Sequence, residues 1–69
     1  MTRVILNGQR ALLADQASVV EAVAAAGAPA EGRGVAVAVD GEVVPRGAWE
    51  STELHEGQRV EVLQAVQGG

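Results

Sequence analysis

Two glycines at the end of the chain carry the group best placed to react, the terminal carboxylate. Gly68 and Gly69 are the last of the 69 residues. A terminal carboxyl group has an ordinary pKa of about 3.3–3.7 and is therefore ionised at neutral pH. Such a carboxylate can attack the α-phosphorus of ATP in line to form an acyl adenylate, which a sulfur or amine nucleophile then displaces. Because glycine has no Cβ, this end of the chain can enter a narrow cleft of a partner enzyme.

The remaining residues show no pattern typical of a catalytic or metal site. Cysteine is absent, which excludes disulfides, thiolate metal ligands and a cysteine nucleophile. We expect His55, the single histidine, to be an exposed loop residue. Glu50, Glu53 and Glu56 recur every three residues, but a hard cation needs more oxygen ligands from several elements, so an exposed acidic face is the better interpretation. We therefore predict no catalytic residue, no bound cofactor and no metal site.

The charge balance excludes several classes of partner. Five arginines, no lysine and nine acidic residues give a net charge of −4, so the chain lacks the basic surface that binds nucleic acid or anionic lipid. No window of about 18 apolar residues occurs, and the opening MTRVILNGQR has no apolar signal-peptide core. We expect a cytoplasmic protein that binds neither nucleic acid nor membrane.

Two β-hairpins are predicted, each around a dipeptide that tolerates positive φ, namely Asn7-Gly8 and Asp40-Gly41. The strands that flank these turns are expected over residues 2–6, 9–13, 35–39 and 42–44. A last strand is expected over residues 58–66, with Val60 and Val62 on one face. Residues 47–54 are expected to be irregular or to form a short helical turn.

One short helix is predicted over residues 19–26. Ser18 and Glu21 form a capping-box pattern, in which the Ser18 hydroxyl accepts a hydrogen bond from the Glu21 amide. Apolar side chains recur at helical spacing and form one stripe, at Val19, Ala22, Val23 and Ala26. Gly27 supplies the C-terminal cap, and Pro29 prevents the helix from continuing.

This order of elements predicts the α+β class and a β-grasp (ubiquitin-like) fold, a mixed five-stranded sheet crossed by one main helix. In that fold the first and last strands run parallel at the centre of the sheet. We expect residues 1–66 to form the domain and residues 67–69 to form a flexible Gly-Gly tail. Trp49 is expected to cover one edge of the core. The expected core consists of Val4, Leu6, Leu13, Val19, Ala22, Val23, Val37 and Val60.

An apolar patch is predicted on the sheet face that the helix does not cover. Leu63 and Ala65 alternate away from Val60 and Val62, and Ile5 points outward from the first strand. A sheet covered on one side normally keeps its other face polar, so Ile5, Leu63 and Ala65 suggest a docking surface for a partner. The acidic charge of the chain would complement basic partner surfaces.

Over its whole length the chain resembles the thiamine-biosynthesis sulfur carrier family (ThiS-like). The matching segments are VILNG, SVVEAV, VAVDGEVVPRGAW and EGQRVEVLQAVQGG. The most specific feature is Pro45-Arg46-x-x-Trp49 together with a terminal Gly68-Gly69. The resemblance implies a β-grasp fold and adenylation of Gly69 by a ubiquitin-activating-type adenylyltransferase that uses ATP. It also implies conversion of Gly69 to a thiocarboxylate and donation of the sulfur to thiazole synthase, so that the chain is a co-substrate and not an enzyme.

Two alternatives remain open at this point. The small subunit of molybdopterin synthase shares the fold, the terminal Gly-Gly and the thiocarboxylate, but that group tends to carry prolines where this chain has Ala65-Val66-Gln67. A non-catalytic ubiquitin-like interaction module would never have its Gly-Gly activated. The chain also departs from the family at Gln58-Arg59, where a Gly-Asp-x-Ile-like start of the last strand is usual.

Overall fold

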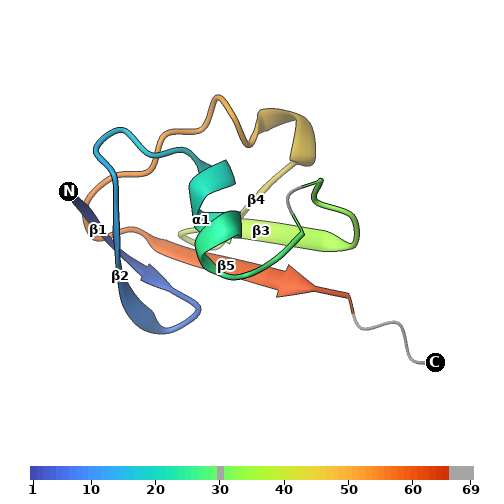
Figure 1. Ribbon diagram of the computed structural model, residues 1–69, viewed down its shortest axis with the longest axis horizontal. Coiled ribbons are helices and arrows are strands. Elements are labelled where there is room, and N and C mark those ends of the chain that lie inside the picture. The colour runs from blue at the N-terminus through green and yellow to red at the C-terminus, as the bar shows by residue number, and fades with distance from the viewer. Residues whose placement is uncertain (30, 66–69) are drawn as a thin grey trace.

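The computed structural model describes residues 1–29 and 31–65, so the predicted Gly-Gly tail, including Gly68 and Gly69, lies outside the described residues. One helix lies across one face of a sheet (Figure 1). The elements are β1 (Thr2–Leu6), β2 (Gln9–Leu13), α1 (Val19–Ala25), β3 (Val35–Val39), β4 (Glu42–Val44), the 3-10 turn η1 (Arg46–Ala48) and β5 (Arg59–Gln64). No helix in the described part of the chain is long and apolar enough to cross a membrane.

The strands form one five-stranded sheet in the order β2-β1-β5-β3-β4. β1 and β5 are parallel neighbours, with Ile5 opposite Arg59 and Leu6 opposite Val60. All other neighbouring strands are antiparallel. The predicted α+β class and β-grasp arrangement, a mixed five-stranded sheet with one main helix, are confirmed. β5 is the central strand, so the chain leaves the sheet from its middle.

Both hairpin turns form where Asn-Gly and Asp-Gly predict them. Asn7 and Asp40 have φ values of 49° and 50°, and the glycines that follow them are also in the left-handed region. Positive φ at both central positions defines a type I′ turn, whose twist matches that of the flanking strands.

The start of α1 differs from the prediction. Ser18 precedes the helix as expected, but its hydroxyl makes no capping hydrogen bond. Ser18 instead forms an isolated β-bridge with Glu53, and the Val19 amide donates to the Thr52 carbonyl oxygen over 3.0 Å. The predicted capping box is wrong because the long connection before β5 supplies the partner for this helix terminus.

The end of α1 follows the prediction more closely. The Gly27 amide donates to the Ala24 carbonyl and the Ala28 amide to the Val23 carbonyl, the two bonds of a Schellman motif. The last helical residue is Ala25, one residue earlier than predicted. Ala26 is exposed and does not belong to the buried stripe.

The core lies between α1 and the sheet, and all eight residues predicted for it are buried. Among the described residues, five more are buried in this core: Ala17, Val39, Trp49, Leu54 and Val62. Trp49 is only 2% exposed, and its Nε1 donates to the Val44 carbonyl oxygen over 2.9 Å. It covers the edge of the core as predicted, with its one polar atom satisfied.

The last strand is shorter than the predicted range of 58–66. Gln64 is the final residue of β5 because its partner, Val35, is the first residue of β3. At the other end, the Gln58 amide bonds to the His55 carbonyl in a turn and so lies outside the strand. The connection contains a 3-10 turn at 46–48, which begins one residue before the predicted 47–54 segment and covers only its first two residues.

Candidate functional site

The site begins where the described chain leaves the sheet, at the end of β5. β5 runs through the centre of the sheet and its arrow points away from the N-terminus (Figure 1). The Ala65 amide donates a 2.7 Å hydrogen bond to the Gly34 carbonyl oxygen, just before β3 begins. This bond fixes the backbone four residues before Gly69, and four extended residues reach roughly 13 Å at most.

Asn7 supports the same half of β5 from the opposite side. β1 ends at Leu6, and the backbone bonds to β5 end with the Asn7 amide, which donates to the Val60 carbonyl oxygen over 2.9 Å. The Asn7 side chain continues the pairing, because its Oδ1 accepts from the Val62 amide over 2.8 Å and its Nδ2 donates to the Val62 carbonyl over 3.3 Å. Sequence reasoning assigned Asn7 to the turn alone and missed this pair of bonds.

The Pro45-Arg46-x-x-Trp49 segment packs against the loop before β3. The Arg46 Nε donates to the Glu31 carbonyl oxygen over 3.0 Å, and its guanidinium lies 4.9 Å from the centroid of the Trp49 ring. Gly32 lies against both side chains. The motif therefore links the core-covering Trp49 to the loop whose Gly34 bonds to Ala65.

The uncovered face of the sheet carries an apolar patch near the end of β5. Leu63 is 66% exposed and lies opposite Ala36, while Val43 is 73% exposed and lies opposite Ala38. Ala65 is exposed next to them. We call this set the open-face patch; its members are Ala36, Ala38, Val43, Leu63 and Ala65.

Ile5 is placed differently from the grouping that the sequence predicts. It is half-buried, and its register partners are Arg10 on β2 and Arg59 on β5. Three residues of β5 lie between Arg59 and Leu63, and one of them, Glu61, points outward. The charge beside Ile5 is therefore basic, which differs from the expected acidic surroundings.

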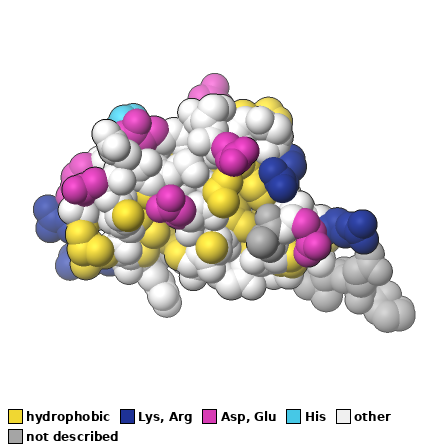
Figure 2. Space-filling view, turned by 45° about the horizontal axis from the view of Figure 1, so that its top comes forward, with side chains coloured by type: hydrophobic (Ala, Val, Ile, Leu, Met, Phe, Trp, Pro, Cys, Tyr) yellow, Lys and Arg dark blue, Asp and Glu magenta, His cyan; other side chains and the backbone are white. Residues whose placement is uncertain are grey.

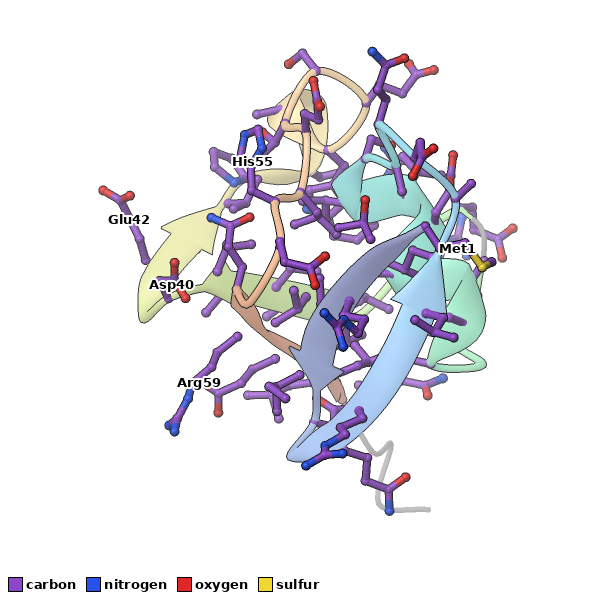
Figure 3. The ribbon with its side chains drawn as sticks, turned by 90° about the vertical axis from the view of Figure 1, so that its left-hand side faces the viewer. Met1, Asp40, Glu42, His55 and Arg59 are labelled. Carbon is purple, nitrogen blue, oxygen red and sulfur yellow. The ribbon has the colours of Figure 1, made fainter. Side chains whose placement is uncertain are left out.

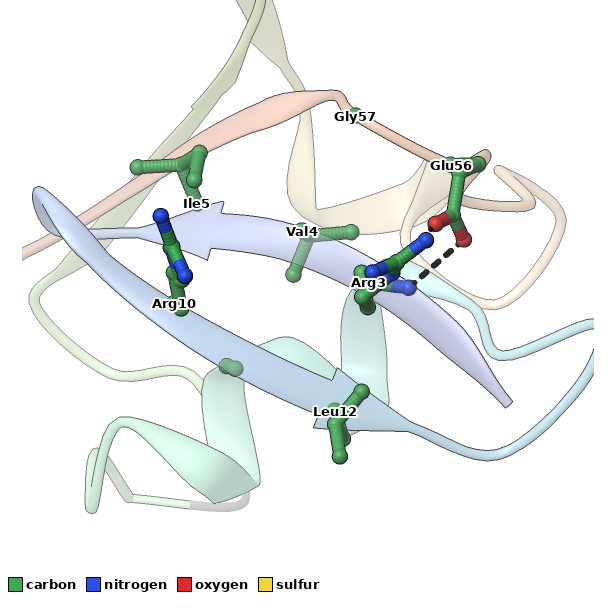
Figure 4. A pocket seen from close by; sticks show the side chains of 8 residues that line it. Arg3, Val4, Ile5, Arg10, Leu12, Glu56 and Gly57 are labelled. Carbon is green, nitrogen blue, oxygen red and sulfur yellow. Dashed lines mark hydrogen bonds and ion pairs between the residues drawn. The ribbon is translucent and has the colours of Figure 1, made fainter.

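A shallow hollow of about 580 Å³ lies on the outer side of β1 and β2, next to Ile5 (Figure 4). Arg3 and Glu56 close one end of it. The Arg3 backbone amide donates to Glu56 Oε1 over 2.9 Å, and the Arg3 Nε donates to Oε2 over 2.7 Å. These two bonds to the charged form hold the pKa of the Glu56 carboxyl below its ordinary value. Through these two bonds, Glu56 ties the segment between η1 and β5 to strand β1.

The other residues considered for chemistry are not brought together. His55 lies on the connection above the β3–β4 turn (Figure 3), and its backbone amide donates to Gln58 Oε1 over 2.7 Å. Carboxylates are spread over the surface in Figure 2 and do not gather at one point. Within residues 1–29 and 31–65, no group of three or more histidine and acidic side chains has the arrangement of a metal site.

Comparisons with known proteins identify the family. A model of the ThiS family matches residues 4–69 of the chain. The crystal structure of a thiamine biosynthesis protein (ThiS) from Geobacter metallireducens superimposes with a TM-score of 0.76 at 30% sequence identity, covering 99% of this chain and 100% of that one. A search of curated proteins found no match. The resemblance to ThiS-like sulfur carriers is confirmed, and the chain belongs to the ThiS family.

Proposed function

We propose that this protein carries sulfur as a C-terminal thiocarboxylate on Gly69 for thiazole formation in thiamine biosynthesis. The observation that carries the proposal is the family match, which runs through Gly69 on a chain whose central strand leads to that residue. The similar protein from Geobacter metallireducens is described as a thiamine biosynthesis protein, which supports the same pathway here.

The first proposed step is adenylation by a ubiquitin-activating-type adenylyltransferase. A carboxylate oxygen of Gly69 attacks the α-phosphorus of ATP, the bond to the bridging oxygen breaks, and pyrophosphate leaves. The product is a mixed anhydride between Gly69 and AMP. ATP belongs to the partner enzyme, and the carrier contributes the nucleophile and the shape that presents it.

In the second step, a sulfur nucleophile at the oxidation level of sulfide attacks the activated carbonyl carbon of Gly69, so that a C–S bond forms, the C–O bond to AMP breaks and AMP leaves. The resulting thiocarboxylate then donates its sulfur in the active site of thiazole synthase. Gly68 passes through the narrow cleft of each partner, since it has no side chain to obstruct the path. The chain therefore acts as a co-substrate of two enzymes and turns over no substrate itself.

Docking of both partners is proposed to use the open sheet face. Leu63 and Ala65 lie closest to the end of β5, so a partner that covers them also receives the chain end. An exposed apolar patch of this kind is typical of a protein–protein contact. Arg10 and Arg59 on either side of Ile5 favour a partner that is acidic opposite this part of the face.

Intact-mass analysis of the protein purified from its native cell tests the proposal. A thiocarboxylate replaces one oxygen of the Gly69 carboxyl group with sulfur and raises the mass accordingly. We expect this heavier form, and we expect alkylation by iodoacetamide to label it, because cysteine is absent from the chain. A population that carries only the carboxylate in cells actively making thiamine would contradict the proposal.

A further inference from the structure

Arg46 links its own segment, which includes Trp49, to the loop at Glu31, 15 residues earlier in the chain. Its Nε donates to the Glu31 carbonyl oxygen over 3.0 Å, and its guanidinium lies over the ring of Trp49 at 4.9 Å. Trp49 is itself fixed in the core by its bond to the Val44 carbonyl. A planar cation above an aromatic ring is attracted to it, so the Arg46 side chain is held in one place although it is exposed.

The loop from Glu31 to Gly34 packs tightly against this arginine. A Cβ at Gly32 would lie 2.5 Å from the Arg46 Nε and 2.8 Å from the Trp49 ring. Both distances are far shorter than an ordinary contact, and Gly32 also has a φ of +72°. Only glycine therefore allows the loop to approach this closely.

The same loop makes the last described contact before the C-terminal segment. The Val35 amide donates to the Gly32 carbonyl over 3.1 Å, and two residues after Gly32 the Gly34 carbonyl accepts the Ala65 amide over 2.7 Å. A displacement of Gly32 therefore moves Gly34, and with it the point where the chain leaves the sheet.

We propose that Arg46 is a positioning residue that fixes the exit of the C-terminal segment through Gly32, Gly34 and Ala65. The inference rests on the proposed function, because the segment that it positions is the one that reacts. Arg46 does not touch the reacting atoms. It holds the backbone at Ala65 so that Gly69 reaches the required depth in the partner, where a misplacement of about 1 Å can cost roughly a hundredfold in rate.

The main rival role for an exposed arginine is a direct contact with the partner. A lost contact raises the KM for the carrier and leaves kcat unchanged, whereas a misplaced chain end lowers kcat and leaves KM unchanged. Pyrophosphate exchange by the activating enzyme, measured over a range of carrier concentrations, separates the two roles.

The first test compares Arg46→Met with Arg46→Lys and Val23→Ala. Arg46→Met should lower the kcat of exchange roughly tenfold at unchanged KM. By NMR, it should also speed amide hydrogen exchange of Ala65. Arg46→Lys keeps a cation over Trp49 and an N–H donor. It should therefore retain part of the wild-type kcat and part of the wild-type protection of the Ala65 amide. Val23→Ala lowers global stability without touching the loop and should leave kcat and Ala65 exchange near wild type.

The second test uses glycine variants that share the same backbone strain. Gly32→Ala and Gly41→Ala both place a side chain at positive φ, but a Cβ at Gly41 meets nothing within 4 Å. Gly32→Ala should reproduce the loss of kcat and the faster Ala65 exchange, and Gly41→Ala should show neither. In an Arg46→Ala background, Gly32→Ala should lower kcat by a smaller factor than it does in the wild type, because one of the two clashing side chains is gone.

The two proposals fail in different ways. No exchange with the wild-type carrier and its activating enzyme would overturn the proposed function. Normal exchange with wild type, combined with a normal kcat for Arg46→Met, would overturn the positioning role alone. A raised KM at unchanged kcat would also overturn it and assign Arg46 to the partner interface.

Discussion

The side chain of Asn7 bonds to both backbone groups of Val62, 55 residues later in the chain. It accepts from the Val62 amide over 2.8 Å and donates to the Val62 carbonyl over 3.3 Å. A turn residue thereby completes the pairing of the central strand, after β1 has ended at Leu6. This support lies on the half of β5 that leads to Gly69.

Replacement of Asn7 by glycine should reveal how much these two bonds contribute to the stability of the fold. Glycine keeps the positive φ of the turn, so the main loss is the side-chain contact with Val62. We expect the free energy of unfolding to fall by about 1–2 kcal/mol, and the Val62 amide to exchange faster by NMR. Gln16→Gly is the matched control, since Gln16 also has a positive φ, of 64°, but makes no side-chain hydrogen bond among the described residues. Equal losses for the two variants would show that chain entropy alone explains the effect.

Patterns with a local cause were predictable from the sequence. Asn7-Gly8 and Asp40-Gly41 set their turns through their own φ preferences, and alternation along β3 and β5 set which valines are buried. The helix followed from its apolar stripe and from Gly27. These features depend on neighbours within a few residues, so the printed sequence contains their cause.

Features that depend on distant partners were not predictable. Ser18 has the right position for a cap, but the Thr52 carbonyl, which takes the first helical amide, comes from a connection more than 30 residues later. The grouping of Ile5 with Leu63 assumed a register that the sequence does not reveal, and β1 and β5 pair so that Arg59 lies beside Ile5. The close packing of Gly32 against Arg46 likewise could not be predicted, because no pattern in the residues around either position indicates it.

The core between α1 and the sheet predicts a clear stability effect for Val23→Ala. Val23 is 2% exposed, so the smaller side chain leaves a cavity, partly offset by the better helix propensity of alanine. We expect a loss of about 1–3 kcal/mol in urea denaturation. Val43→Ala removes the same atoms at an exposed position and should change stability by no more than about 0.5 kcal/mol. An unchanged midpoint for Val23→Ala would mean that α1 does not face the sheet as described.

Glu56 predicts a pH dependence of stability. Hydrogen bonds from the Arg3 backbone amide and guanidinium keep the pKa of Glu56 below its ordinary value of 4.5 in the folded protein. The stabilisation is therefore present above that value and is lost as the pH falls through the folded-state pKa. Glu56→Gln should reduce the difference between the melting temperatures at pH 7 and pH 3. Arg3→Met should reduce this difference in melting temperature less, because the bond from the backbone amide of residue 3 remains. A larger effect for Arg3→Met than for Glu56→Gln would contradict the role given to the Glu56 carboxylate.

The open-face patch predicts a defect in docking for Leu63→Asp. The side chain is exposed, so circular dichroism and the melting temperature should stay near wild type. We expect the Kd for the activating enzyme, measured by calorimetry, to rise about tenfold or more, as for loss of an apolar anchor. Leu12→Asp is the matched control, since Leu12 is 60% exposed on the same face but lies on the edge strand β2. Wild-type affinity for Leu63→Asp would exclude the patch as the interface, and Ile5→Asp would show how far the contact extends towards β1.

The central claim is that Gly69 carries the activity and the rest of the chain presents it. The most direct measurement is ATP–pyrophosphate exchange with the cognate activating enzyme, followed by intact-mass detection of the thiocarboxylate, for wild type and for the deletion of Gly69. Removal of one residue withdraws the carboxylate by about 3.5 Å, so exchange should fall by roughly a hundredfold or more and no thiocarboxylate should form. His55→Ala and Glu53→Ala should match wild type in both readouts. Exchange and thiocarboxylate formation at the wild-type rate by the deletion variant would contradict the account.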